Sequence, residues 1–277
     1  MLSIEFFEKN IEELKYDISL DMSQSLTKWL TAVIYDAYSE YPNSEEIILE
    51  KLTHSFSTVV QARRIISKSG DLHLDQIVAD LSCLLHDIGR FKETSHNEHL
   101  TEVSGFDHAT YGALIFEQYV FSDFPICENN KKVIAETIRE HGKFEYTGNN
   151  LYVKLVRDAD KLDNLINLDF QVENSSAVLK SKGVTKTVFD DFLAKKQIIS
   201  SNIKSEADFI IFLSRWFFDI NFVATTLLLK EAGVVNTIVQ KLKNYEANDY
   251  EIGEIELKLN SVIDNAIDGS NSTKSIY

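Results

Sequence analysis

Two side chains that can bind a metal, His86 and Asp87, stand next to each other at the end of an apolar run. Burying an imidazole and a carboxylate there without partners would be costly. Together they suit a borderline divalent cation, and the two oxygens of Asp87 can bridge two ions. The alternative is a His–Asp pair that only caps the end of a helix, which is the commoner explanation for an isolated doublet. Other ligands elsewhere in the chain are needed to favour the metal.

Further candidate ligands occur in two separate segments. His54 lies beside an apolar helical face, and a later acidic segment contains Asp158, Asp160 and Asp163. Periodicity does not choose between Asp158 and Asp160, because each lies about 100° around the helix from the apolar position Ala159. The residues alone therefore leave both carboxylates open as ligands.

Helical patterns predict the elements that position these residues. One helix is expected to start near Ser55, with His54 at or near its beginning, and to stop at Gly70. The next is expected from Asp75, a suitable N-cap, to Gly89, with the doublet in its last turn. Two helices are expected within residues 1–50, and another helix is expected to follow the turn at Tyr41-Pro42-Asn43. Further helices are expected over 107–124, 128–141, 150–168, 186–196, 205–231, 234–244 and 250–267. Between and after them we expect a loop that serves as a lid or rim over 91–105, a surface excursion over 169–185 and a frayed tail over 269–277.

Composition favours an all-α fold. The chain has 277 residues and 44% hydrophobic content, but only ten glycines and two prolines. This balance favours long helices over a turn-rich β architecture. The sequence shows no internal repeat and no long low-complexity linker. We therefore expect a single all-helical domain over residues 1–277.

The order of the candidate ligands resembles the HD-domain superfamily of metal-dependent phosphohydrolases. The family pattern is a His on one helix, a His-Asp doublet on a later helix and a distant Asp in an Ala-Asp-x-Leu setting. In this chain the matching residues are His54, His86, Asp87 and Asp160. The resemblance implies that these four residues form the metal-binding core, and it selects Asp160 over the aspartate two positions earlier.

The resemblance covers about residues 50–170, which are the expected HD-type metal-binding core. It implies an HD-domain-like helical bundle with additional C-terminal helices. The flanking helices then fall in 1–49 and 171–268.

Two additional histidines, His108 and His141, lie between the doublet and the final aspartate. In binuclear branches of the superfamily, histidines in this interval hold a second ion. The alternative is that each is only a helix-end residue, and the helix dipole favours a histidine at a C-terminus. The resemblance therefore implies one or two divalent ions (Mn, Fe, Mg, Co, Ni or Zn), with His108 and His141 as second-metal or phosphate ligands.

The ligand set implies hydrolysis of a phosphate ester through a metal-activated water. Asp87 is the residue expected to orient this water, as ligand and proton acceptor. Arg90 is a fixed cation suited to a planar contact with phosphate, although it can equally cap helix carbonyls. Asp87 and Arg90 are thus the expected catalytic residues, with Lys161 as a second candidate cation.

The formal net charge of −15 argues against binding to a nucleic-acid polymer but leaves a small phosphorylated substrate open. A nucleotide is the first candidate. The cyclic-dinucleotide branch is disfavoured, because its His-His-Glu and Gly-Tyr-Pro segments do not follow Glu140-His141. Two rival functions are a non-catalytic HD-type module that binds a nucleotide or a partner, and a di-iron oxygenase that uses the same ligand cage.

A cytoplasmic location is expected. The two cysteines, Cys83 and Cys127, form no disulfide framework, and the first sixteen residues lack the pattern of a signal peptide. No apolar stretch approaches the roughly 20 residues that span a bilayer, so no membrane partner is expected. The sequence leaves oligomer formation open.

Overall fold

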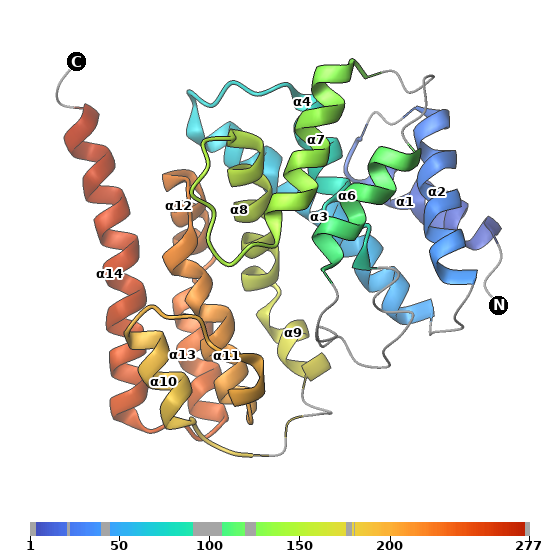
Figure 1. Cartoon of the computed structure of the whole chain (residues 1–277). Helices are drawn as coiled ribbons and strands as arrows, with labels where there is room; N and C mark the ends of the chain where they lie inside the picture. Colours follow the sequence, from blue (N-terminus) through green and yellow to red (C-terminus); the bar gives the residue numbers. More distant parts are fainter. Residues whose placement is uncertain are drawn as a thin grey trace. The chain divides into compact units, whose positions relative to one another are not determined.

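The computed structural model describes residues 4–20, 23–39, 45–90, 107–119, 126–175, 179 and 181–274. Within these ranges the chain forms helices and no strand, apart from an isolated parallel bridge between Ser181 and Ser205 (Figure 1). The predicted all-α fold class is confirmed. None of the described helices combines the length and apolar character needed to cross a membrane.

The chain divides into two compact units. The first comprises 1–64 and 71–159, and the second comprises 65–70 and 160–277. Two of the divisions fall inside helices, α3 (Glu45–Ser69) and α8 (Leu151–Ile166). The expectation of one domain over the whole chain stays a prediction.

The first unit is built from helices that pack in pairs. Helix α1 (Ile4–Asp17) packs on α2 (Gln24–Ser39). Helix α6 (His108–Tyr119) lies beside α7 (Glu128–His141), which also packs against α4 (Gln76–Leu85) (Figure 1). The helices of this unit are α1 (Ile4–Asp17), α2 (Gln24–Ser39), most of α3 (Glu45–Ser69), α4 (Gln76–Leu85), α6 (His108–Tyr119), α7 (Glu128–His141) and the first part of α8 (Leu151–Ile166). Its core includes the buried side chains of Ile11, Ile34, Phe56, Val59, Leu85, Phe116, Ile138 and Val153.

Short polar side chains fix where two of these helices begin. Oδ1 of Asp75 accepts hydrogen bonds from the amides of Ile77 and Val78, as predicted for the N-cap of α4. Asp107 does the same for α6, because its Oδ1 accepts from the amide of Thr110 at 3.0 Å. These caps satisfy amides that have no partner within the helix. The cap formed by Asp107 thereby fixes the start of α6, where His108 is the first residue.

Two helix boundaries near the predicted site differ from the sequence prediction. Helix α3 begins at Glu45, so His54 lies in its interior and not near its start. Helix α4 ends at Leu85, so the doublet lies in the turn that follows and not in the last helical turn. In that turn the amide of Ile88 donates to the carbonyl of Leu85, and the amide of Arg90 donates to that of Asp87. The predicted loop over 91–105 lies outside the described residues.

The second unit contains the remaining helices, and a buried carboxylate binds the residues that precede two of them. Asp208 accepts hydrogen bonds from the amide and hydroxyl of Thr185 and from the amide of Lys204. The helices are α9 (Leu168–Ser175), α10 (Lys186–Leu193), η1 (Ser200–Asn202), α11 (Glu206–Ser214), η2 (Arg215–Asp219), α12 (Val223–Glu231), α13 (Val234–Asn244) and α14 (Asp249–Lys274).

Three predictions in this unit are corrected. Part of the expected surface excursion is helix α9, which buries Leu168 and Val172 one turn apart. The expected helix over 205–231 is broken at η2, where the side chains of Arg215 and Asp219 bond to residues of other segments. Tertiary bonds of this kind leave no trace in local propensity. Helix α14 continues to Lys274, beyond the predicted start of a frayed tail.

Candidate metal centre

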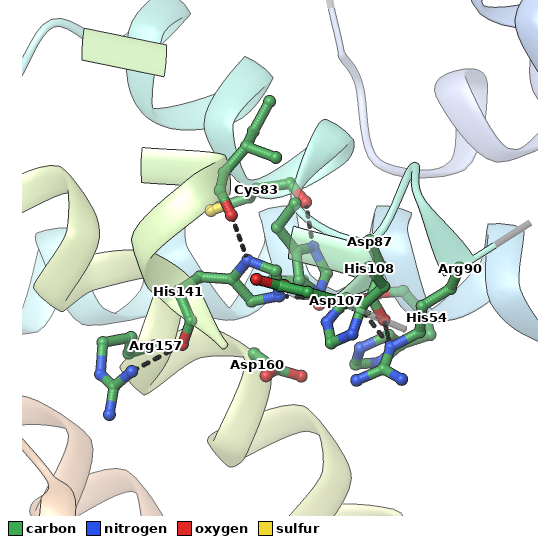
Figure 2. A network of polar contacts seen from close by, with 12 residues as sticks. His54, Cys83, Asp87, Arg90, Asp107, His108, His141, Arg157 and Asp160 are labelled. Atoms are coloured by element: carbon green, nitrogen blue, oxygen red, sulfur yellow. Dashed lines mark hydrogen bonds and ion pairs between the residues drawn. The ribbon is translucent and has the colours of Figure 1, made fainter. Parts of the chain in front are cut away.

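The carboxylate of Asp87 lies at the centre of a buried group of histidines (Figure 2). Its Oδ1 is 3.4 Å from Nε2 of His108 and 3.4 Å from Nε2 of His141. Its Oδ2 is 3.8 Å from Nε2 of His86. The rings meet edge to face, with centroids 5.0 Å apart for His86 and His141 and 5.3 Å apart for His108 and His141. The structure thus brings together four predicted site residues from three segments.

Each of these side chains stands at the end of a helix. His86 is the C-cap of α4 and Asp87 follows it, while His108 is the first residue of α6 and His141 the last of α7. Because α4 and α6 both pack against α7, three helix ends converge on one point.

Gly89 allows the turn after the doublet to touch the start of α6. A Cβ atom at position 89 would lie 2.1 Å from the carbonyl oxygen of His108 and 2.7 Å from the amide nitrogen of Gly112. Only a residue without a side chain fits this contact. Gly89 therefore sets how closely His108 approaches Asp87.

Hydrogen bonds to the main chain fix the orientation of two imidazoles. Nδ1 of His86 lies 2.6 Å from the carbonyl oxygen of Cys83, and Nδ1 of His141 lies 2.7 Å from that of Ile138. A carbonyl only accepts, so each Nδ1 carries the hydrogen. In the neutral ring the lone pair is then on Nε2, the atom that faces Asp87, which is the usual arrangement of metal-binding histidines.

His54 and Asp160 join the same group. Ligand atoms of His54, His86 and Asp160 all lie within 4.8 Å of one another, and the rings of His54 and His86 are 5.4 Å apart. Asp160 directly follows Ala159, the last residue of the first unit, in the continuous helix α8. Its Oδ1 accepts a hydrogen bond from the side-chain amide of Asn164 at 2.8 Å.

Asp158, the alternative ligand left open by periodicity, is completely buried. It belongs to neither of the two candidate ligand groups that the described residues form. The geometry therefore favours Asp160, as the family pattern does.

The electrostatics keep Asp87 ionised and His108 neutral. Burial by itself would raise the pKa of Asp87, but Arg90 and the surrounding histidines hold this pKa well below its ordinary value. Nε of Arg90 lies 2.9 Å from both carboxylate oxygens. Burial, reinforced by the positive charge of Arg90, lowers the pKa of His108 to about 3. An ionised carboxylate and a neutral imidazole are the forms that bind metals.

This donor set fits a divalent metal. The described residues form two ligand groups that share His86: one adds His54 and Asp160, and the other adds Asp87 and His141. Within the described part of the chain, Nε2 of His108 is buried and makes no hydrogen bond. Such an atom is costly unless something binds it. Imidazole nitrogens combined with carboxylate oxygens suit first-row divalent cations.

Comparison with protein families agrees with this geometry. Residues 52–165 match the family model for the HD domain. Over this segment the sequence is identified as an HD domain. This match lies within the HD-type core expected over 50–170, and it includes all six candidate ligands. No curated protein and no solved structure matches the chain.

Two cations near the HD-domain site have carboxylate partners. Arg90, predicted to contact phosphate, binds Asp87 in this structure. Lys161, which follows Asp160, is buried and pairs with Asp219, and its Nζ also donates to the main-chain carbonyl of Asp219 at 2.9 Å. A phosphate contact by either residue stays a prediction.

Sequence reasoning missed two residues that support the candidate ligands. Asn164 binds Asp160, and its position four residues later in a helix is a signal that could have shown this. Arg157 is buried and donates to the carbonyl of His141 at 2.6 Å. Its acceptors are main-chain oxygens, which every sequence has, so no pattern of side chains could have revealed it.

Proposed function

We propose that this HD domain is a metal-dependent phosphohydrolase that acts on a small phosphorylated metabolite, with a nucleotide as the first candidate. The observation that carries the proposal is the buried, ionised Asp87, which lies among three histidines. One of these, His86, also belongs to a second candidate ligand group with His54 and Asp160. A protein that served only as a scaffold would gain nothing from placing these groups together, because each costs free energy when buried.

The residues would divide the work as follows. His54, His86 and Asp160 would hold one divalent ion, and Asp87 with His141 and His108 would hold a second or contact phosphate. When bound, such an ion neutralises charge on phosphoryl oxygens and lowers the pKa of an adjacent water. Asp87 would orient the attacking water and accept its proton at one carboxylate oxygen.

Arg90 supports the choice of a phosphorylated substrate. Its guanidinium is already beside Asp87, with Nε 2.9 Å from each oxygen. A planar cation at this position suits a phosphoryl group that approaches the same carboxylate. The net charge of −15 disfavours polymeric phosphates, so the substrate proposed is small.

The decisive experiment combines metal analysis of the purified protein with a screen of phosphate release. The substrates are nucleoside mono-, di- and triphosphates, cyclic nucleotides and sugar phosphates. We expect bound divalent metal in the parent protein. The variants His86→Ala and Asp87→Asn should lose at least about a hundredfold in turnover, more than the loss of an outer partner of a metal ligand usually causes. His73→Ala is the matched control, because His73 is exposed and lies outside both ligand groups.

Two results would redirect the proposal. Phosphate release by His86→Ala and Asp87→Asn at the parental rate would refute the hydrolase. A folded parent protein without divalent metal would favour the non-catalytic module, and an iron pair with a mixed-valent signal would favour the oxygenase.

A further inference from the structure

Arg157 bridges two helices that carry candidate ligands, and it does so through main-chain oxygens. Its side chain is among the largest that are fully buried in the described residues. Nη1 lies 2.6 Å from the carbonyl oxygen of His141, 2.5 Å from that of Lys143 and 3.5 Å from that of Glu140. Nη2 lies 3.4 Å from the carbonyl oxygen of Phe144. One guanidinium therefore binds carbonyls at the end of α7 and in the first residues of the connection to α8.

The position of these acceptors explains why a buried cation is stable there. The last carbonyls of a helix have no partner within the helix, and the helix dipole makes its C-terminus attractive to a positive charge. Arg157 supplies both the missing donors and the charge at the C-terminus of α7. Its planar fork suits several acceptors at once.

His141 is held at two points as a result. Its carbonyl oxygen accepts from Arg157, and its Nδ1 donates to the carbonyl of Ile138. Arg157 also lies three residues before Asp160, so about one turn of α8 separates the two side chains. Because Arg157 binds the carbonyl of His141, a displacement of Arg157 would be transmitted to the main chain of His141.

We propose that Arg157 is a positioning residue for the metal centre, because it holds the end of α7 that carries His141 (Figure 2). Its proposed role is structural, because it acts on His141 through hydrogen bonds to main-chain carbonyls. The inference rests on the proposed function only in that the site binds a divalent metal.

The test uses Co²⁺ as the metal, with affinity measured by titration calorimetry and ligand geometry by the visible absorption of the ion. Melting of the metal-free protein is measured in parallel. Arg157→Met keeps an unbranched side chain about as long as the apolar stem of arginine and removes all donors. We expect it to weaken Co²⁺ binding about ten- to hundredfold, which is typical when an outer partner of a ligand is lost, and to alter the absorption spectrum.

Arg157→Lys is the conservative variant and protects the test against misfolding. A single ammonium can serve the carbonyls of His141 and Lys143, but it cannot reproduce the second branch to Phe144. We expect Arg157→Lys to fold and to lose less affinity than Arg157→Met, about threefold to tenfold.

Arg215→Met is the matched control for loss of a buried arginine. Arg215 is also buried and donates to two main-chain carbonyls, those of Lys195 and Lys196, but neither belongs to a segment with a candidate ligand. We expect it to lower the melting temperature while the Co²⁺ affinity stays at the parental value. His86→Ala defines the signal of a disabled site.

The outcomes separate the two proposals. If the parent binds no Co²⁺, the metal centre itself is refuted. The positioning role alone is refuted if the parent binds Co²⁺, His86→Ala does not, and both Arg157 variants bind with the parental affinity and spectrum. If Arg157→Met does not fold, the same result for Arg157→Lys refutes the positioning role. An equal loss of affinity in Arg215→Met would show a general effect of destabilisation and would also overturn it.

Discussion

Replacing Gly89 by alanine tests whether a main-chain contact sets the geometry of the site. The new Cβ would lie 2.1 Å from the carbonyl oxygen of His108, whereas Cβ atoms essentially never approach another atom closer than 3.0 Å and ordinarily lie 3.4–4 Å away. The turn and the start of α6 would have to separate by about 1 Å. Because both partners are main chain, no change of rotamer can relieve the clash.

The expected cost is at the upper end of the range for overpacking, about 3 kcal/mol of unfolding free energy. For a chain of this size, that corresponds to a fall in melting temperature of about 5–10 °C. The same displacement would move His108 away from Asp87, so metal affinity should fall by at least about tenfold. Calorimetric melting of the metal-free protein and Co²⁺ titration measure the two effects separately.

Two other glycines provide a graded control. Gly253 lies in α14, and a Cβ there would have no atom within 4 Å, so Gly253→Ala should stabilise the helix by about 0.5–1 kcal/mol. At Gly112 the nearest atoms would be 3.1–3.3 Å away, so its alanine variant should cost less than Gly89→Ala. The reasoning fails if Gly89→Ala melts with the parent and binds metal equally well.

Two further predictions concern the start of α6. The first is measured with a chelator present, so that the protein is metal-free. The contribution of His108 to the free energy of unfolding should be complete above its ordinary pKa near 6.5 and be lost as the pH falls toward its pKa of about 3 in the folded protein. Between pH 7 and pH 5 the parent should lose about 2 kcal/mol more than His108→Gln in denaturant titrations, and equal losses would contradict the neutral, buried imidazole. Asp107→Ala removes the cap formed with Thr110 and should cost about 1 kcal/mol in the same assay, whereas Asp107→Ser should retain most of it. If the two Asp107 variants are equally stable, the cap does not contribute to the free energy of unfolding and this prediction is wrong.

Elements with clear end signals were predictable from the sequence. The boundaries of α7 agree with the prediction because Gly142 follows a continuous helical pattern, and the start of α4 agrees because Asp75 is a strong N-cap. The start of α3 was wrong by about three turns, since the ten residues before Ser55 give no local signal that distinguishes them from a separate helix.

The site shows a similar division between local signals and tertiary ones. The doublet could be proposed from its residue types, and His108 and His141 from the family resemblance. The structure places His86, His108 and His141 around Asp87. The role of Gly89 could not be proposed, because a glycine after a helix is expected merely as a stop signal. Its close contact with α6 depends on how α4 and α6 pack on α7, which only the folded structure shows.

The contacts of Arg157 have a consequence for how the surface of this protein can vary. Carbonyl oxygens of Glu140, His141, Lys143 and Phe144 accept from its guanidinium, and these oxygens remain whichever side chains the residues carry. Lys143 and Phe144 expose their side chains to solvent while their carbonyls face the guanidinium. The connection from α7 to α8 can therefore change its charge and its aromatic character without releasing His141. In protein engineering, these two positions offer a place to alter recognition while the ligand framework is left intact.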